Sequence, residues 1–255
     1  MLSRLFRRVA AGRTFSGPPG RRLYAIGDVH GRLDLLDDLV VRIRADLARQ
    51  PVSNAAFVFL GDLIDRGPDS AGVIERVRTL ALPGALPGKV ALILGNHEEM
   101  LLRALAAEPG VAHDWLTYGG DTCIESYGVS SAPLAALDER RVADALAAAI
   151  PRVHVALLKS AHDTIGFGDY LLVHAGIRPG VAVEDQAPRD LRWIREPFLS
   201  DAHDHGVVVI HGHTITDGVD RRVNRIGIDT GAYQTGVLTA AVIQEDKVRF
   251  LATGD

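Results

Sequence analysis

The stretch Leu23-Tyr24-Ala25-Ile26-Gly27-Asp28-Val29-His30-Gly31 decides the fold of this 255-residue chain. Apolar residues run into a glycine, and two side chains that can bind a metal ion, Asp28 and His30, follow at once. A helical pattern comes next over 33–49, with one apolar face formed by Leu35, Leu36, Leu39, Val40, Ile43 and Leu47. The stretch therefore predicts a buried strand, a tight turn that carries polar side chains, and a helix.

The same order of strand, glycine and polar side chain recurs along the chain. Residues 55–60 form a second apolar segment that ends at Gly61-Asp62, and residues 89–94 form a third that ends at Gly95-Asn96-His97. The segment 70–80 between them has helical spacing. Strands that alternate with helices predict an α/β fold with a largely parallel core sheet.

The second half returns to strands after a block with helical pattern. We expect helices at 98–107, 134–150 and 154–160, and then strands at 170–174, 207–211, 225–229, 237–244 and 248–251. Two of these strands run into His174-Ala175-Gly176 and His211-Gly212-His213-Thr214. The simplest organisation is one domain over 23–255 with a helical insert at about 98–165.

The first 22 residues differ from the rest in composition. They contain six arginines and no acidic residue, and they end near the Gly/Pro cluster 17–20, so we expect a solvated, disordered basic arm. A targeting peptide and a weak contact with an anionic membrane are the alternatives for this arm. The whole chain has a formal charge of −4, so the part after the arm carries −10. An acidic body is a poor general binder of nucleic acid, and we expect no such partner.

Two simple counts exclude further classes of protein. The sequence has no apolar run near the roughly 20 residues that cross a bilayer, which excludes a membrane span. Cys123 is the single cysteine, which rules out an internal disulfide and fits a reducing compartment. We therefore expect a cytoplasmic protein.

Polar side chains that follow neighbouring parallel strands are expected to converge, because the carboxyl ends of these strands share one edge of the sheet. Here they are Asp28, His30, Asp62, Asn96, His97, His174, His211 and His213. Carboxylate, amide and imidazole donors suit Mn²⁺, Fe or Zn²⁺ better than a metal that thiolates select. These side chains are more than one ion needs as ligands. A bridging carboxylate would divide them between two ions about 3.5–4 Å apart.

Five segments resemble the signature blocks of PPP-type metallophosphatases, in the calcineurin-like phosphoesterase superfamily. They are GDVHGR (27–32), GDLIDRGPDS (61–70), GNHEE (95–99), HAGI (174–177) and GHT (212–214). Segments 115–128 and 191–198 resemble the bacterial branch with small serine/threonine protein phosphatases and symmetrical diadenosine tetraphosphate hydrolases. The resemblance covers about 23–244 and implies a sandwich of two mixed β-sheets flanked by helices.

The resemblance also implies a set of metal ligands. In this reading Asp28 and His30 bind the first ion and Asp62 bridges both ions. Asn96, His174 and His213 complete the second site. His211 stands beside these ligands and is not expected to bind a metal. The implied cofactors are two divalent ions, with Mn²⁺ expected and Fe or Zn²⁺ as alternatives.

The resemblance further implies roles in catalysis. His97 would act as the general acid that protonates the leaving group, with Asp65 orienting its imidazole. Arg66 would bind the phosphoryl oxygens through its planar, charged guanidinium group. Arg195 is expected to be a second phosphate-binding arginine, and Arg192 is the alternative.

Other residues near these motifs receive structural interpretations. Glu98 is expected to support the start of a helix or a neighbouring ligand rather than to act in catalysis. Trp115, Tyr118 and Tyr127 could line the site, but packing in the core is the default expectation. Cys123 has no basic residue beside it in the sequence and is expected to be inert.

The implied function is a dimetal-dependent phosphatase that hydrolyses phosphomonoesters by direct attack of a metal-bound hydroxide. We expect the serine/threonine protein phosphatase type, with a phosphorylated protein or a small phosphorylated molecule as substrate. The alternative is a symmetrical dinucleoside polyphosphate hydrolase, which a helical insert that caps the cleft would favour. A catalytically silent phosphate-binding scaffold is disfavoured, because every expected ligand and His97 are present.

Overall fold

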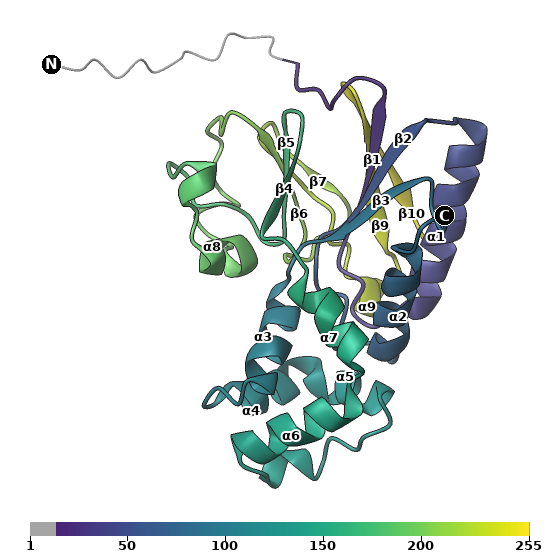
Figure 1. Ribbon diagram of the computed structural model, residues 1–255. Helices are drawn as coiled ribbons and strands as arrows, with labels where there is room; N and C mark the ends of the chain where they lie inside the picture. The colour runs from purple at the N-terminus through teal and green to yellow at the C-terminus, as the bar shows by residue number, and fades with distance from the viewer. Residues whose placement is uncertain (1–13, 255) are drawn as a thin grey trace, which may run out of the picture.

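Two five-stranded mixed sheets face each other in the structure, a computed structural model that describes residues 14–254 (Figure 1). The first sheet has the strand order β10-β9-β1-β2-β3, and the second has the order β4-β5-β6-β8-β7. The strands are β1 (Arg21–Ile26), β2 (Asn54–Phe59), β3 (Gly88–Leu92), β4 (Thr164–Phe167), β5 (Tyr170–Val173), β6 (Val208–His211), β7 (Asp220–Arg221), β8 (Arg225–Gly227), β9 (Thr239–Gln244) and β10 (Lys247–Ala252).

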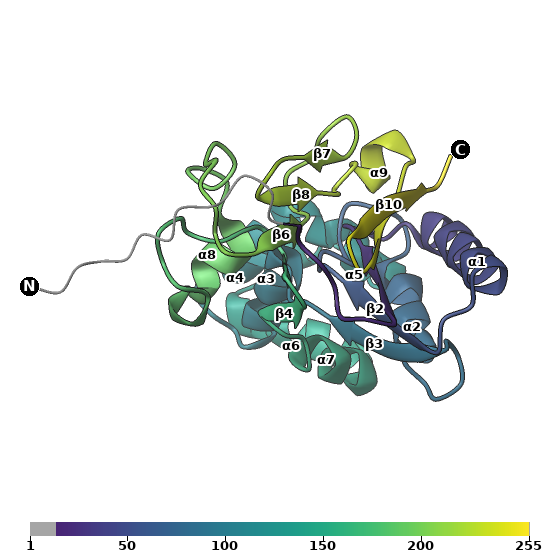
Figure 2. The ribbon, with the colours of Figure 1, turned by 90° about the horizontal axis from the view of Figure 1, so that it is seen from above.

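Helices cover the outer sides of both sheets. The α-helices are α1 (Leu33–Arg49), α2 (Ser70–Leu80), α3 (Asn96–Leu105), α4 (Val111–Trp115), α5 (Asp121–Ser126), α6 (Glu139–Ala149), α7 (Arg152–Lys159), α8 (Pro188–Trp193) and α9 (Ala232–Thr235). Short turns of other helix types are η1 (Leu116–Gly120), η2 (Leu134–Ala136) and η3 (Val183–Asp185). Figure 1 shows α1 and α2 beside the first sheet, α8 beside the second, and the block α3–α7 below them. Seen from above, α1 and α8 lie at opposite ends of the molecule, with the sheets between them (Figure 2).

The parallel strands of each sheet end at the same level. In the first sheet β1, β2 and β3 are parallel, and their register pairs Ile26 with Phe59 and Phe59 with Leu92. In the second sheet β5, β6 and β8 are parallel, and Leu172 pairs with Ile210. The loops that follow these strands therefore leave the two sheets along neighbouring edges, as the α/β prediction requires.

Alternate side chains of each strand enter different cores. Leu23 and Ala25 of β1 face the second sheet and belong to the core between the sheets. Tyr24 and Ile26 point the other way, into the core beneath α1 and α2. The outer face of the second sheet packs against α8 and the segment after it, through residues such as Phe198. The order of layers is helix, sheet, sheet, helix, and the predicted fold class is confirmed.

The predicted elements agree with the structure where the pattern is long. The helices expected at 33–49 and 70–80 are α1 and α2 with the same bounds. Short elements were not predicted: α4 and α5 have five and six residues and are separated by Gly119-Gly120, which leaves too few turns for a helical period. In the described part of the chain, no helix is long and apolar enough to cross a membrane.

The folded chain begins before the predicted domain boundary at residue 23. The backbone N–H of Gly17 donates to the carbonyl of Glu245 over 2.9 Å, and that of Ser16 donates to Asp169 Oδ2 over 2.9 Å. Strand β1 itself begins at Arg21. Residues 14–22 of the predicted arm therefore pack on the domain, while residues 1–13 lie outside the described residues.

A buried polar network fixes the start of β1. Arg22 is 2% exposed and donates to the carbonyl of Gln50 over 2.7 Å and to Tyr24 Oη over 3.2 Å. Asp46 of α1 accepts from Tyr24 Oη over 2.6 Å and from Arg249 over 2.5 Å, with Arg22 at 3.5 Å. One carboxylate thus offsets the charge of a buried guanidinium and ties α1 to β1 and β10.

Asp46→Ala is expected to lower the free energy of unfolding by about 3 kcal/mol, because it leaves the charge of Arg22 buried without its partner. Urea unfolding followed by circular dichroism measures this change. Asp144→Ala is the control, since its ion pair with Arg140 is exposed and contributes less than about 1 kcal/mol. Equal stabilities of the two variants would contradict the assignment.

Candidate active site

A cavity of about 580 Å³ opens where the strand ends of the two sheets meet. It is bounded by loops that follow β2, β3, β6 and β8, by the start of α3, by the helical block and by the segment after α8. Its lining residues are Asp62, Arg66, Asn96, His97, Met100, Tyr118, Trp193, Arg195, His213, Thr214, Ile215 and Tyr233. Six of the ten predicted site residues are among them. The other four are buried and do not line the cavity: Asp28, His30, Asp65 and His174.

The carboxylate of Asp62 stands at the centre of the predicted ligands. Its Oδ2 atom lies 3.4 Å from His174 Nε2 and 3.6 Å from His30 Nε2. Within residues 14–254, two groups of donor atoms lie close enough together to hold a metal ion, and both contain Asp62. One adds His30 and His97, and the other adds His174 and His213. Asp62 therefore has the position expected of a bridging carboxylate.

Asn96 completes the second group of donors. Its Oδ1 atom lies 2.9 Å from His174 Nε2 and 2.9 Å from His213 Nδ1. The Nε2 atom of His213 is buried without a hydrogen-bond partner. Four predicted ligands from the ends of β2, β3, β5 and β6 thus converge, with an unsatisfied nitrogen among them.

Asp28 lies beside these groups and belongs to neither. Its Oδ2 atom accepts from the backbone N–H of His213 over 2.9 Å, and its Oδ1 atom is buried without a partner. Gly212 makes this packing possible, since a Cβ atom at that position would lie 1.9 Å from Asp28 Oδ1. A buried, unpartnered carboxylate oxygen is costly unless a cation binds it.

Backbone carbonyls set the tautomers of two predicted ligands. Nδ1 of His30 lies 2.8 Å from the carbonyl of Ile64, and Nδ1 of His174 lies 2.8 Å from that of Leu60. A carbonyl oxygen only accepts, so both Nδ1 atoms carry the proton and both Nε2 atoms face Asp62. This arrangement orients an imidazole for metal binding through Nε2.

The electrostatics of the cluster favour cations. Burial raises the pKa of Asp28 well above its usual range, helped by the charge of Asp229. Burial lowers the pKa of His30 to about 3. Burial also opposes the ionisation of Asp62, but the neighbouring histidines, His174 first, hold its pKa well below the usual range. Asp62 and Asp28 in turn raise the pKa of His174 to about 10 against its burial, so the buried carboxylates attract positive charge. Imidazole and carboxylate donors in such a site suit divalent ions of the borderline class.

The backbone is strained at the same residues. Seven non-glycine residues in the described part of the chain have φ between +45° and +72°. Five of them are predicted site residues: His30, Asp62, Asp65, Arg66 and His213. Such conformations cost of order 1–3 kcal/mol each and persist where surrounding contacts enforce them.

His97 and Asp65 form the predicted pair. Nδ1 of His97 donates to Asp65 Oδ2 over 2.6 Å, and its Nε2 atom lies 4.0 Å from Asp62 Oδ2. Burial opposes protonation of His97, but Asp62 and Asp65 together raise its pKa above the usual value. A histidine that lines the cavity and whose carboxylate neighbours favour its protonated form has the arrangement expected of a general acid.

The two arginine candidates for the second phosphate contact differ in their partners. Arg192 forms ion pairs with Glu99 at 2.8 Å and with Asp163 at 2.5 Å, and it does not line the cavity. Arg195 is exposed and lines the cavity. Arg66 also lines the cavity, where its guanidinium lies 4.9 Å from the ring centre of Tyr233.

Glu98 joins two of the site loops. Its buried carboxylate accepts from the backbone N–H groups of Asp62 (2.9 Å), Leu63 (2.7 Å) and Gly95 (3.0 Å). Burial raises its pKa to about 7, although these hydrogen bonds favour the charged form. Glu98 therefore fixes the loop that carries Asp62 relative to the loop that carries Asn96, as its predicted supporting role implies.

Sequence reasoning missed several residues of the cavity. Tyr118, for which core packing is the default expectation and lining of the site the alternative, is 61% exposed and lines the cavity. Trp193 donates to Glu99 over 2.6 Å and also lines the cavity, as does Tyr233. Tyr233 had a usable signal, since it follows the strand-end sequence Asp229-Thr230-Gly231, which resembles the other site loops. Trp193 had none, because its position depends on a contact 94 residues away.

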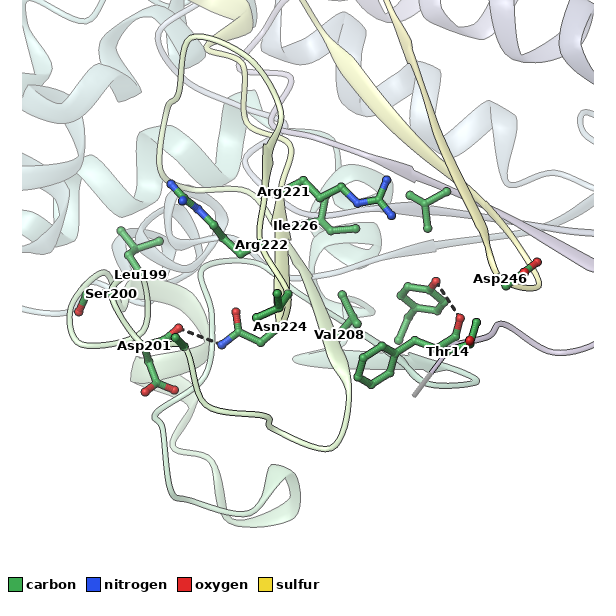
Figure 3. Close-up of a pocket in the computed structure, with 15 residues that line it drawn as sticks. Thr14, Leu199, Ser200, Asp201, Val208, Arg221, Arg222, Asn224, Ile226 and Asp246 are labelled. Carbon is green, nitrogen blue, oxygen red and sulfur yellow. Dashed lines mark hydrogen bonds between the residues drawn. The ribbon is translucent and has the colours of Figure 1, made fainter. Parts of the chain in front are cut away.

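A larger cavity of about 1120 Å³ lies elsewhere, on the second sheet beside Thr14 (Figure 3). No predicted site residue lines it. Two of its polar side chains make structural contacts: Asn224 donates to the carbonyl of Asp201 over 2.9 Å, and Arg222 pairs with Asp220 at 2.7 Å. Size alone therefore does not identify the functional cavity.

The sequence profile of the calcineurin-like phosphoesterase family matches residues 21–236. The chain belongs to this family, which confirms the family predicted from the motifs. It is 28% identical over 232 residues to serine/threonine-protein phosphatase 1 of Salmonella typhimurium, covering 88% of this chain and 93% of that one. It is 34% identical over 163 residues to a symmetrical bis(5'-nucleosyl)-tetraphosphatase of Acidovorax sp. (strain JS42), covering 64% of this chain and about half, 47%, of that one.

A solved structure shares the fold. It is described as a candidate diadenosine tetraphosphatase and superposes with a TM-score of 0.64 at 22% identity, covering 93% of this chain and 98% of that one. The metallophosphoesterase of Sphaerobacter thermophilus has a TM-score of 0.51 at 20% identity, covering 91% and 88%. These likenesses establish the two-sheet fold.

Glu98→Gln is expected to weaken Mn²⁺ binding about 10–100-fold, because one oxygen that accepts from backbone N–H groups becomes a donor and the two loops separate. Isothermal titration with Mn²⁺ measures the affinity of the purified chain. Glu108→Gln is the matched control, since Glu108 pairs with Arg103 away from the cavity. Unchanged Mn²⁺ affinity in Glu98→Gln would refute the supporting role.

Proposed function

We propose that this chain is a dimetal-dependent phosphatase that hydrolyses phosphomonoesters, of the serine/threonine protein phosphatase type. The observation that carries the proposal is the Asp62 carboxylate, which two groups of buried donors share. One of these groups contains His97, whose ring pairs with Asp65. The substrate is a phosphorylated protein or a small phosphorylated molecule. The likeness to the Salmonella protein phosphatase over 93% of its length supports this type.

The metal ligands follow from the predicted division of the donors. Asp28, His30 and Asp62 would hold the first ion. Asp62 with Asn96, His174 and His213 would hold the second. When bound, two divalent ions, proposed to be Mn²⁺, supply Lewis-acid polarisation of the phosphoryl oxygens and an activated water.

The remaining side chains bind the phosphoryl group and move a proton. Arg66 and Arg195 would contact its charged oxygens, since both guanidinium groups line the cavity. As the bond between phosphorus and the leaving oxygen breaks, that oxygen takes a proton from His97 Nε2. Asp65 accepts from Nδ1 of the same ring and keeps it aligned.

Symmetrical hydrolysis of dinucleoside polyphosphates is the second candidate function. Tyr118 and Trp193 at the cavity are 61% and 36% exposed, and exposed aromatic rings suit stacking against a nucleobase. The tetraphosphatase of Acidovorax supports it over 64% of this chain. We rank the phosphatase first because the same chemistry needs no binding site for two nucleosides.

Two further expectations accompany the proposal. The single domain with a helical insert at about 98–165 is proposed as the catalytic unit. A cytoplasmic location without a nucleic-acid partner is proposed because Cys123 is a free, buried thiol and the body is acidic. Burial raises the pKa of this thiol well above its usual range, which fits an inert residue.

A comparison of substrates distinguishes the two candidate functions. With Mn²⁺ present, we expect a higher kcat/KM for a phosphoserine or phosphothreonine peptide and for p-nitrophenyl phosphate than for diadenosine tetraphosphate. Phosphate release and chromatography of nucleotide products measure these rates. Preferred release of ADP from the dinucleotide would instead establish the second function.

His97→Asn is expected to lower kcat at least about 100-fold, because it removes the proton donor for the leaving group. Asp62→Asn is expected to abolish turnover, because it weakens both metal sites at once. His203→Asn is the control, since the His203 side chain is 90% exposed and lies outside the cavity. Turnover near that of the unchanged chain in either His97→Asn or Asp62→Asn would overturn the assignment.

A further inference from the structure

The helical block reaches the His97–Asp65 pair through one buried indole. Trp115 at the end of α4 is fully buried, and its Nε1–H group lies 2.9 Å from Asp65 Oδ2 and 3.2 Å from Asp65 Oδ1. Asp65 is 50 residues earlier in the chain, on the loop after β2. The default expectation of plain core packing therefore omits a hydrogen bond from the insert to the carboxylate that orients the proposed general acid.

Asp65 needs external support to keep its orientation. It has φ of +72°, and its fully buried carboxylate must present Oδ2 to His97 Nδ1, 2.6 Å away. Its backbone N–H donates to Ser70 Oγ over 3.0 Å, which holds the main chain. The indole acts on the carboxylate itself, since it donates toward both oxygens and so limits rotation about the side-chain bonds.

The segment that follows Trp115 holds the next residue of the same loop. The carbonyl of Gly119 accepts from the backbone N–H of Arg66 over 3.1 Å. Gly119 has φ of +109°, and a Cβ atom there would lie 2.8 Å from Arg66 Cγ. Trp115 and Gly119 therefore belong to one segment that fits against two consecutive strained residues of the site.

We propose that Trp115 is a positioning residue for general acid catalysis. Its N–H group fixes the Asp65 carboxylate, which in turn holds the His97 ring with Nε2 toward the leaving group. The proposal rests on the proposed function, because it presupposes that His97 donates the proton. It adds a role for the helical insert that substrate access alone does not require.

Loss of this hydrogen bond affects substrates unequally. When the bond between phosphorus and oxygen breaks, its electron pair stays on the leaving oxygen, and that oxygen takes the proton from His97 Nε2. A strongly basic leaving group such as phenolate needs this proton in the transition state, while 2,4-dinitrophenolate leaves readily without it. A residue that acts only on stability lowers both rates by the same factor.

The test compares Trp115→Phe with the unchanged full chain, both loaded with Mn²⁺, on phenyl phosphate and on 2,4-dinitrophenyl phosphate. We expect kcat for phenyl phosphate to fall about ten-fold and kcat for the dinitrophenyl ester to fall less than about two-fold, with KM unchanged. Val142→Ala is the control, because Val142 is a fully buried side chain of α6 in the same helical block. Its two rates are expected to change by one common factor.

Equal losses on the two esters in Trp115→Phe would overturn the positioning role. If Trp115→Phe does not fold, site-specific replacement of Trp115 by 3-benzothienylalanine keeps the shape of the ring and removes only the N–H donor. The same unequal loss is then expected, and equal losses on the two esters overturn the proposal. His97→Asn distinguishes failure of the proposed function from failure of the positioning role alone. If His97→Asn retains turnover, the proposed function fails and the positioning role fails with it. If it is inactive while Trp115→Phe loses both rates equally, the positioning role alone fails.

Discussion

The structure depends on a carboxylate that is buried among histidines at the end of β2. Asp62 is 2% exposed, and His174 and His30 lie within 3.6 Å of its Oδ2 atom. A buried charge is costly unless cations or hydrogen bonds offset it. The loops around Asp62 must therefore supply such partners and leave space for its carboxylate. The loop adopts φ of +48° at Asp62, and Gly95 leaves space for the carboxylate, since a Cβ atom there would lie 2.2 Å from Asp62 Oδ1. Glu98 then fixes both loops from below.

Much of this arrangement was predictable because it is encoded locally. A strand that ends in glycine and a polar side chain is a short pattern, and parallel pairing brings the ends of such strands together without further information. The long helices α1 and α2 were predictable for the same reason, since several turns share one apolar face. The family profile over 21–236 agrees with the family predicted from these patterns. The individual roles of the ligands stay predictions that the geometry supports.

The parts that escaped prediction depend on contacts between distant segments. Whether Arg192 or Arg195 faces the cavity follows from the ion pairs of Arg192 with Glu99 and Asp163, 93 and 29 residues away. The same carboxylate of Glu99 also holds Trp193. The spacing of residues in the sequence does not contain this information, because Arg192 and Arg195 lie close together in one short segment. The helices α4 and α5 escaped for a related reason: at five and six residues they depend on tertiary packing rather than on their own periodicity.

The helical block has a part in the site that its position below the sheets does not reveal (Figure 1). Asp65 and Arg66 are consecutive non-glycine residues with φ of +72° and +68°, a conformation that costs of order 1–3 kcal/mol for each. The loop after β2 keeps it only because other contacts outweigh that cost, and two of them come from the block: the Trp115 indole on Asp65 and the Gly119 carbonyl on Arg66. The strain and the support therefore lie on segments about 50 residues apart. Because these contacts reach Asp65 and Arg66 directly, the block is part of the framework that holds the proposed general acid and the proposed phosphate-binding arginine in place.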